Sequence, residues 1–381
     1  MSVSMRRRGL FVLLLLLLIL SSCSTSSTSK TSATATVPIA TPAPKPLPNA
    51  TQIDAYLSHL AATGALTGSV LVAHDGSVFS KGYGPADRDA HILNTVQTMF
   101  RIGSVTKQFT AMAILILQER GKLHVQDNLC MYIANCPQDW RPITLYDLLI
   151  HASGIPNYTD FTDFVATWNE PTTPAQLIAR FKNRPLAFSP GAKWSYSNSN
   201  YILLGYIIER VSGESYATFL QKNIFTPLKM THTGYDDSQP HLPTHATGYY
   251  AGYVKPEFYD MSVFYAAGAL YSDVEDLYTW DQALAQHRLV SQQSLDAMFA
   301  PHIPCPPHGC ALSTDLGYGY AWFVAKQPEG RLIYHLGRID GYLSYNGFYP
   351  ASNVDVVVLS NLEGTNVLKI GTTLAGMVLS K

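Results

Sequence analysis

Residues 100–109 read FRIGSVTKQF, and a nearly unbroken apolar run follows from Phe109 to Leu117. A run of this length that is apolar on every face predicts a helix buried inside the protein. Gly103 supplies a tight turn into the helix, and Gly121 stands where a left-handed residue commonly ends one. The stretch therefore predicts a rigid buried helix that the chain enters through a glycine turn.

Ser104 and Lys107 stand three residues apart at the start of this helix. Residues i and i+3 share a helix face, so the lysine amine can contact the serine hydroxyl. A serine hydroxyl attacks poorly until a nearby base accepts its proton, and the field of a helix N-terminus favours the neutral form of a lysine. The pair predicts a covalent nucleophile at Ser104.

The Ser-x-x-Lys spacing is weak by itself, because Ser27 to Lys30 repeats it in a stretch that cannot be catalytic. Two further polar motifs support the prediction, and together with Ser104 and Lys107 they are called the three stations below. Residues 196–198 (YSN) lie in a polar loop before an apolar helix that runs to about Arg210, and the phenol there could share the serine proton. Residues 335–337 (HLG) could end a strand in a glycine that lets the backbone approach a substrate.

With these stations and with residues 148–154, 188–235 and 268–277, the chain resembles the serine β-lactamase and penicillin-binding-protein-like hydrolases. The similar branch holds class C β-lactamases, D-alanyl-D-alanine carboxypeptidases, D-aminopeptidases and related esterases. The resemblance covers roughly Ile53 to the C-terminus. It implies an α/β (α+β) fold of the β-lactamase/transpeptidase type, with an antiparallel sheet flanked by helices and a mostly helical lobe at about residues 123–265.

The resemblance also implies a role for each station in acyl transfer. Ser104 is then the acylated nucleophile, Lys107 its hydrogen-bonded activator and Tyr196 the proton shuttle. The backbone N–H groups of Ser104 and Arg338 form the oxyanion hole, a feature that contributes strongly in such enzymes. The implied reaction proceeds through an acyl-enzyme that water hydrolyses, and it requires no cofactor and no metal.

The remaining implied residues surround the substrate. Asn198 contacts its amide or carbonyl, His335 stands at the Lys or His position of the third motif, and Gly337 lies in the strand beside it. The backbone and side chain of Arg338 complete this group. His151 is implied as a supporting residue in a turn beside the cleft.

Leu336 departs from the pattern of the family. β-Lactamases and carboxypeptidases usually carry a hydroxyl there that helps to hold the substrate carboxylate, and leucine cannot donate that hydrogen bond. The chain also has no Glu-x-x-x-Asn element, so efficient penicillin hydrolysis is not expected. Arg338 could replace the lost contact through its bidentate fork, or it could point to solvent.

Residues 1–22 combine three arginines, an apolar run and a Leu-Ser-Ser ending, which is typical of an export signal. The resemblance to bacterial lipoprotein signals implies cleavage and lipid attachment at Cys23, and an uncleaved signal anchor is the alternative. Residues 23–50 are rich in Ser, Thr, Ala and Pro and predict a tether without a core. Residues 51–381 form the predicted hydrolase domain, anchored on the outer side of a membrane at the cell surface or in the periplasm.

Four further cysteines form two closely spaced pairs, as suits an oxidising compartment: Cys130 with Cys136, and Cys305 with Cys310. Residues 302–310 also contain two histidines, so a zinc site is the alternative to the second disulfide. Tyr249, Tyr250 and Tyr253 could bind peptide or sugar near a cleft, although such tyrosines more often pack half-buried.

Strands and helices flank these motifs along the chain. We expect a helix at 52–62, a hairpin at 68–74 and 77–82, strands at 320–325, 332–336, 342–349 and 354–359, and a closing helix at 366–379. The formal net charge is −1, which gives no basic footprint for nucleic acid.

The function that we expect is an exported, lipid-anchored serine hydrolase. Its substrate would be a small-molecule ester, amide or peptide, cell-wall peptides included, cleaved by an esterase or D-peptidase activity. The alternatives are a β-lactamase, a D-Ala-D-Ala carboxypeptidase, and a penicillin-binding sensor module with negligible turnover.

Overall fold

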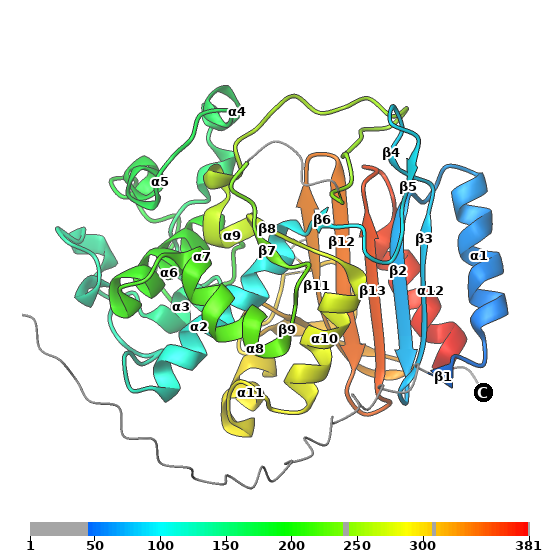
Figure 1. Ribbon diagram of the computed structural model, residues 1–381. Coiled ribbons are helices and arrows are strands. Elements are labelled where there is room, and N and C mark those ends of the chain that lie inside the picture. The colour runs from blue at the N-terminus through cyan, green and yellow to red at the C-terminus, as the bar shows by residue number, and fades with distance from the viewer. Residues whose placement is uncertain (1–44, 239–243, 307–309, 380–381) are drawn as a thin grey trace, which may run out of the picture. The chain divides into compact units, whose positions relative to one another are not determined.

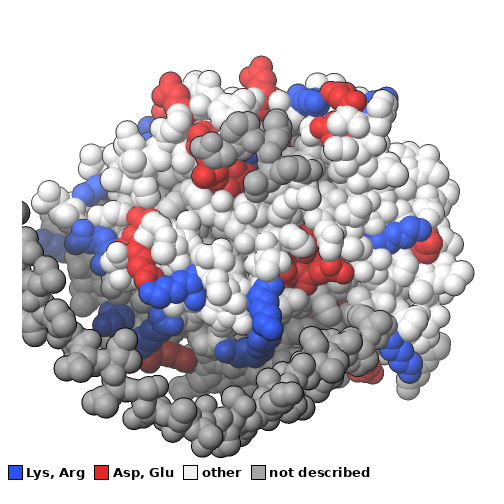
Figure 2. All heavy atoms as spheres, in the orientation of Figure 1, with Lys and Arg blue, Asp and Glu red and all other residues white. Residues whose placement is uncertain are grey.

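A computed structural model describes residues 45–238, 244–306 and 310–379. The predicted signal peptide, the lipidation of Cys23 and most of the predicted tether lie outside the described residues. Within them, no helix is both long and apolar enough to cross a membrane. Side chains of both charge signs are interspersed on the face drawn in Figure 2.

An eight-stranded sheet in the order β1-β3-β2-β13-β12-β11-β10-β9 forms the centre of the described chain (Figure 1). Neighbouring strands are antiparallel, except that β1 runs parallel to β3. The C-terminal strands thus lie between the N-terminal hairpin and the other edge. The strands are β1 (Lys45–Pro46), β2 (Gly68–His74), β3 (Ser77–Tyr83), β9 (Asp315–Tyr318), β10 (Phe323–Gln327), β11 (Gly330–Ile339), β12 (Tyr342–Tyr349) and β13 (Val354–Ser360).

Helices cover both faces of the sheet (Figure 1). α1 (Ala50–Ala62) and α12 (Val367–Leu379) lie on one face, and α10 (Val274–Ala285) packs on the other. Every residue of β13 is buried, which explains its nearly continuous apolar sequence VDVVVLS. The central strands therefore form the core on which the rest of the fold is built.

A mostly helical lobe lies beside the sheet (Figure 1). Its centre is α2 (Thr106–Glu119), buried from Thr106 to Leu117, against which α6 (Asn198–Ser212) and α9 (Tyr265–Gly268) pack. The other helices and helical turns are η2 (Leu129–Met131), η3 (Gln138–Trp140), α3 (Leu145–Leu149), η4 (Tyr158–Asp160), α4 (Phe164–Thr167), α5 (Pro174–Phe181), α7 (Tyr216–Leu220), the π-helical η5 (Gln221–Phe225), α8 (Thr226–Leu228), η6 (Met261–Val263) and α11 (Gln292–Phe299).

A small second sheet leads the chain into α2. It pairs β6 (Phe100–Arg101) with β8 (Leu270–Ser272) and β8 with β7 (Gly234–Tyr235). The turn η1 (Gly103–Val105) follows β6 and continues directly into α2. A further pair, β4 (Pro85–Asp87) with β5 (Ile92–Leu93), extends the first hairpin. These strands of two or three residues are too short to leave a periodic pattern from which they could be predicted.

Within the described residues, secondary structure is present before the expected domain boundary. The predicted tether runs to residue 50, but Lys45 and Pro46 pair with β3 and Leu47 is 3% exposed. The boundary is therefore wrong by about five residues, because the pairing of a two-residue edge strand depends on its partner and not on its own composition. The predicted hairpin and the strands near the C-terminus are present within a few residues of the expected ranges.

Candidate active site

The turn into α2 lies directly against β11. Gly103 has a φ of +50°, and a Cβ built on it would come within 2.8 Å of the Arg338 backbone nitrogen. A Cβ on Gly337 would come within 2.0 Å of the Ile102 carbonyl oxygen. Only glycine lets two backbones approach this closely. The approach brings the helix entry, and with it Ser104, beside the backbone N–H that is expected to complete the oxyanion hole.

Lys107 is fully buried, and its Nζ meets three oxygen atoms. It lies 3.0 Å from Ser104 Oγ, 2.8 Å from Asn198 Oδ1 and 2.7 Å from the Ala267 carbonyl oxygen. None of these partners is charged, and burial holds the pKa of Lys107 well below its usual range. A neutral amine can donate to the oxygens of Asn198 and Ala267, and its lone pair then faces the Ser104 hydroxyl.

Tyr196 also contacts Ser104 through a hydrogen bond between the side chains. Burial raises the pKa of Tyr196 above its usual range, so the phenol keeps its proton at neutral pH. Lys107 Nζ lies 4.9 Å from the centroid of the same ring. The Ser104 hydroxyl thus has a proton acceptor and a proton donor within reach.

Asn198 is the first residue of α6, and its amide is held on two sides. Its Oδ1 accepts from Lys107, and its Nδ2 donates to Thr159 Oγ1 over 3.1 Å. The Asn198 backbone N–H donates to Asn157 Oδ1 over 2.9 Å. Because the amide nitrogen carries two hydrogens, it can donate to a substrate as well as to Thr159.

His335 lies buried in β11, and hydrogen bonds at both nitrogens fix its ring. Nδ1 lies 2.6 Å from the Leu336 carbonyl oxygen, to which it donates, and Nε2 accepts from the Tyr318 hydroxyl at 3.0 Å. Burial, with the nearby Lys107 amine, lowers the pKa of His335 to about 3. The third station is therefore a neutral imidazole at physiological pH, not a cation.

The ring of His151 packs against the ring of Tyr196. The two ring centroids are 4.3 Å apart, and His151 Nδ1 accepts a hydrogen bond from the Ser197 backbone N–H over 3.2 Å. His151 is fully buried, and burial lowers its pKa well below the usual range. A neutral ring packed on Tyr196 restricts where the phenol can move.

The guanidinium of Arg338 forms an ion pair with Glu363. Its Nη2 lies 2.5 Å from Glu363 Oε1, and the Arg338 side chain is 72% exposed. The arginine thus already has a carboxylate partner from its own chain. Leu336 is half-buried and adds only apolar surface. Glu363 thus competes with a substrate carboxylate for the Arg338 guanidinium, and Leu336 offers no donor.

Two contacts of the site were not predicted from the sequence. Tyr318 holds His335 from 17 positions earlier in the chain, across the intervening strand β10. Ala267 contributes only a backbone carbonyl to Lys107. Residue-type patterns cannot reveal a backbone contact, and the Tyr-Gly-Tyr run at residues 318–320 gives no sign that its first tyrosine faces a histidine.

The four cysteines form the two disulfides expected from the sequence. Cys130 joins Cys136 and Cys305 joins Cys310, with Cα atoms 5.3 Å and 5.6 Å apart. The zinc alternative needs Cys305 and Cys310 as thiolate ligands, and the second disulfide occupies both sulfurs. One histidine of that alternative, His308, lies outside the described residues.

Comparisons with known proteins agree with this geometry. The family model described as Beta-lactamase matches residues 53–375. PbpX of Bacillus subtilis, a penicillin-binding-protein relative, is 34% identical over 323 residues, which is 84% of this chain and 75% of PbpX. Penicillin-binding protein 4* of the same bacterium is 29% identical, over 78% of this chain and 68% of its own.

Solved structures extend the match to three dimensions. The octameric penicillin-binding protein homologue from Pyrococcus abyssi superposes with a TM-score of 0.76 at 29% identity, over 87% of this chain and 77% of that one. A penicillin-binding protein from Bacillus halodurans superposes with a TM-score of 0.74 at 26% identity, over 84% of this chain and 98% of that one. The chain therefore belongs to the Beta-lactamase family and is a serine hydrolase of the β-lactamase and penicillin-binding-protein superfamily.

Proposed function

We propose that this chain is an exported, lipid-anchored hydrolase in which Ser104 attacks the carbonyl of neutral esters and amides. The observation that carries the proposal is the burial of the Lys107 amine among uncharged oxygens, 3.0 Å from Ser104 Oγ. An amine without its charge has a lone pair for the serine proton at neutral pH, whereas an ammonium has none.

Acylation follows from the positions of the two proton carriers. Lys107 accepts the Ser104 proton as Oγ attacks the carbonyl carbon, and the N–H groups of Ser104 and Arg338 stabilise the oxyanion. When the intermediate collapses, the leaving alcohol or amine takes the phenolic proton of Tyr196. Lys107 then returns a proton to Tyr196, so both groups regain their starting states.

Deacylation uses the same groups with water in place of the serine. Lys107 accepts a proton from water as the water oxygen attacks the acyl carbonyl. The bond to Ser104 Oγ breaks, and Oγ takes the proton back. General acid and base groups of this kind contribute about 10²- to 10⁴-fold each.

The charges around Ser104 support a substrate that carries no carboxylate next to the bond that is cleaved. His335 is neutral, Arg338 is paired with Glu363, and Leu336 has no hydrogen-bond donor. A carboxylate in such a site would lose hydration while Glu363 competes with it for the Arg338 guanidinium, which is costly. We therefore propose esters and amides, D-peptide amides included, over penicillins and peptides that end in a free carboxylate.

The lipid anchor rests on the Leu-Ser-Ser-Cys23 ending of the predicted signal and on the two disulfides, which suit an oxidising compartment. Cys23→Ser should move the full-length protein from the membrane fraction to the soluble fraction. Continued membrane fractionation would favour the uncleaved signal anchor.

The reaction can be tested on the full-length protein in detergent with three probes: a chromogenic short-chain ester, a chromogenic cephalosporin and a D-alanyl-D-alanine peptide. Ser104→Ala should abolish ester turnover, and Ser27→Ala, in the second Ser-x-x-Lys match, should leave it unchanged. Turnover of the cephalosporin or the peptide alone would favour the β-lactamase or carboxypeptidase alternatives. A stable acyl adduct on Ser104 without turnover would favour a penicillin-binding sensor.

A further inference from the structure

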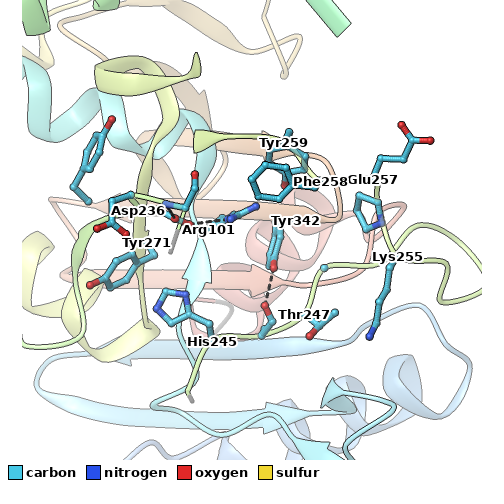
Figure 3. Close-up of a pocket in the computed structure, with 16 residues that line it drawn as sticks. Arg101, Asp236, His245, Thr247, Lys255, Glu257, Phe258, Tyr259, Tyr271 and Tyr342 are labelled. Carbon is cyan, nitrogen blue, oxygen red and sulfur yellow. Dashed lines mark hydrogen bonds and ion pairs between the residues drawn. The ribbon is translucent and has the colours of Figure 1, made fainter. Parts of the chain in front are cut away.

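A cavity of about 710 Å³ lies beside the small second sheet, and none of the proposed catalytic or substrate-contacting residues lines it (Figure 3). Its lining comes from β6, β7, β8, the start of β12 and the segments at residues 236–238, 245–248 and 255–259. The volume is within the range of about 300 to 1,000 Å³ that small-molecule sites occupy. The cavity is large enough for a ligand and is built by elements that the proposed reaction does not use.

Arg101 lies at the centre of this cavity and is held rigidly (Figure 3). Its Nε donates to Asp236 Oδ2 over 2.8 Å, and Asp236 Oδ1 accepts the Ser238 backbone N–H over 2.8 Å. The guanidinium carbon lies 5.0 Å from the centroid of the Tyr259 ring and 5.9 Å from that of Tyr342. An arginine fixed by a carboxylate and two aromatic rings presents its remaining N–H groups in a defined direction.

Aromatic rings make up much of the wall. They are Tyr235, Phe258, Tyr259, Tyr271 and Tyr342. The hydroxyls of Tyr259 and Tyr342 donate to the carbonyl oxygens of Asp340 and Ala246, over 2.7 Å and 2.6 Å. The Tyr259 oxygen also accepts from the Arg101 side chain, and the Tyr342 oxygen from the Gly248 backbone N–H, so the protein holds both phenols in place at the cavity wall. Phe258 is 61% exposed, so it forms part of the rim.

The charges of the lining favour a neutral ligand. Arg101 and Asp236 neutralise each other, and Lys255 is paired with Asp89 over 2.7 Å. These two pairs leave no net charge for an ionic ligand, and the carboxylates of Asp237 and Glu257 are exposed, where water screens their charge. A wholly apolar ligand would remove water from the Arg101 and Asp236 pair without replacing its hydrogen bonds.

We propose that this cavity binds a neutral sugar, as one unit of an oligosaccharide. A sugar ring has apolar C–H faces that can lie on the aromatic rings and hydroxyls at its edge that can both donate and accept. Those hydroxyls match the remaining N–H donors of Arg101 and the remaining lone pairs of the Asp236 carboxylate. The proposal concerns binding alone and does not depend on the reaction of Ser104.

Titration calorimetry on the full-length protein tests the site with uncharged and charged probes. The probes are cellotriose, the trimer of N-acetylglucosamine, and the deacetylated, cationic form of that trimer. We expect at least one uncharged trimer to bind and the cationic trimer to bind more weakly. Binding of the cationic trimer alone, or of no trimer at millimolar concentration, would overturn the proposal.

Two exposed residues of the same loop give a matched pair of variants. Phe258→Ala removes a ring of the cavity rim, and it should raise the Kd for the neutral trimer about tenfold. Val254→Ala removes a side chain that is 60% exposed but does not line the cavity, and the Kd should not change. Because both residues are exposed, neither variant should affect folding. An equal effect of both variants, or of neither, would contradict the proposed position of the sugar.

Discussion

Two basic side chains, the buried Lys107 and the half-buried Arg101, lie six residues apart in the chain and have opposite pKa shifts. Lys107 meets only uncharged oxygens, and burial lowers its pKa. Burial by itself would lower the pKa of Arg101 as well, but Tyr259 and the carboxylate of Asp236 outweigh burial and its pKa is raised. The comparison teaches that depth alone does not determine the role of a buried base: a guanidinium beside a carboxylate stays a fixed charge, whereas a lysine amine among uncharged oxygens can accept a proton.

The largest effect should come from giving Lys107 the permanent charge of Arg101. Lys107→Arg keeps a basic side chain, but a guanidinium does not lose its proton in proteins. We expect kcat/KM for the chromogenic ester to fall by about 10³-fold or more. Circular dichroism should establish that the variant is folded. A folded variant with activity near that of the original chain would show that Lys107 is not the base.

A smaller effect should follow from removing the partner of Arg101. Asp236→Asn leaves a charged guanidinium partly buried without its carboxylate, so the free energy of unfolding should fall by about 2 kcal/mol. Asp54→Asn is the matched control, because the Asp54 and Lys81 pair is 37% and 46% exposed. That control should cost less than about 1 kcal/mol. If urea unfolding shows that both variants lose the same free energy of unfolding, Asp236 does not stabilise the fold more than an exposed ion-pair partner does.

The smallest effect should appear in the pH dependence of stability. The pKa of His335 is about 3 in the folded chain and 6.5 when unperturbed, so below pH 6.5 the unfolded chain binds a proton that the folded chain does not. Stability is therefore lost as the pH falls, by at most about 1.4 kcal/mol per pH unit for one group. His335→Gln should reduce this slope between pH 6.5 and 5.5, where the difference reaches at most about 1.4 kcal/mol. If the free energy of unfolding, measured with urea, depends on pH equally in both proteins, His335 is not the group responsible for the loss of stability.

The pairing of Ser104 with Lys107 could be predicted because both lie on one helix, where spacing fixes proximity. The strands from residue 342 to 360 could be predicted for a similar reason, because their apolar runs are long and bounded by turns. The partners of His335 and Arg101 could not. Tyr318 and Asp236 come from distant parts of the chain, and only the pairing of strands brings them into contact.

Sequence also could not settle what Arg338 contacts. A carboxylate from a substrate and one from Glu363 satisfy the same guanidinium, and the pairing depends on the path of the chain after β13. The cavity around Arg101 was hidden for a related reason. Tyr249, from the cluster considered in the sequence, is buried by packing, and the rings that line the cavity belong to neighbouring positions without a distinctive spacing.

The close backbone approach of residues 102–103 to residues 337–338 restricts how this enzyme can change in evolution. Backbone atoms, not side chains, position the N–H donors at the helix entry. A side chain on Gly103 or Gly337 would clash with the facing backbone. Mutation therefore has little freedom to adjust the oxyanion hole gradually. Leu336, between His335 and Gly337, can change without disturbing that contact, so new substrate preferences can arise while the chemistry of Ser104 is inherited intact.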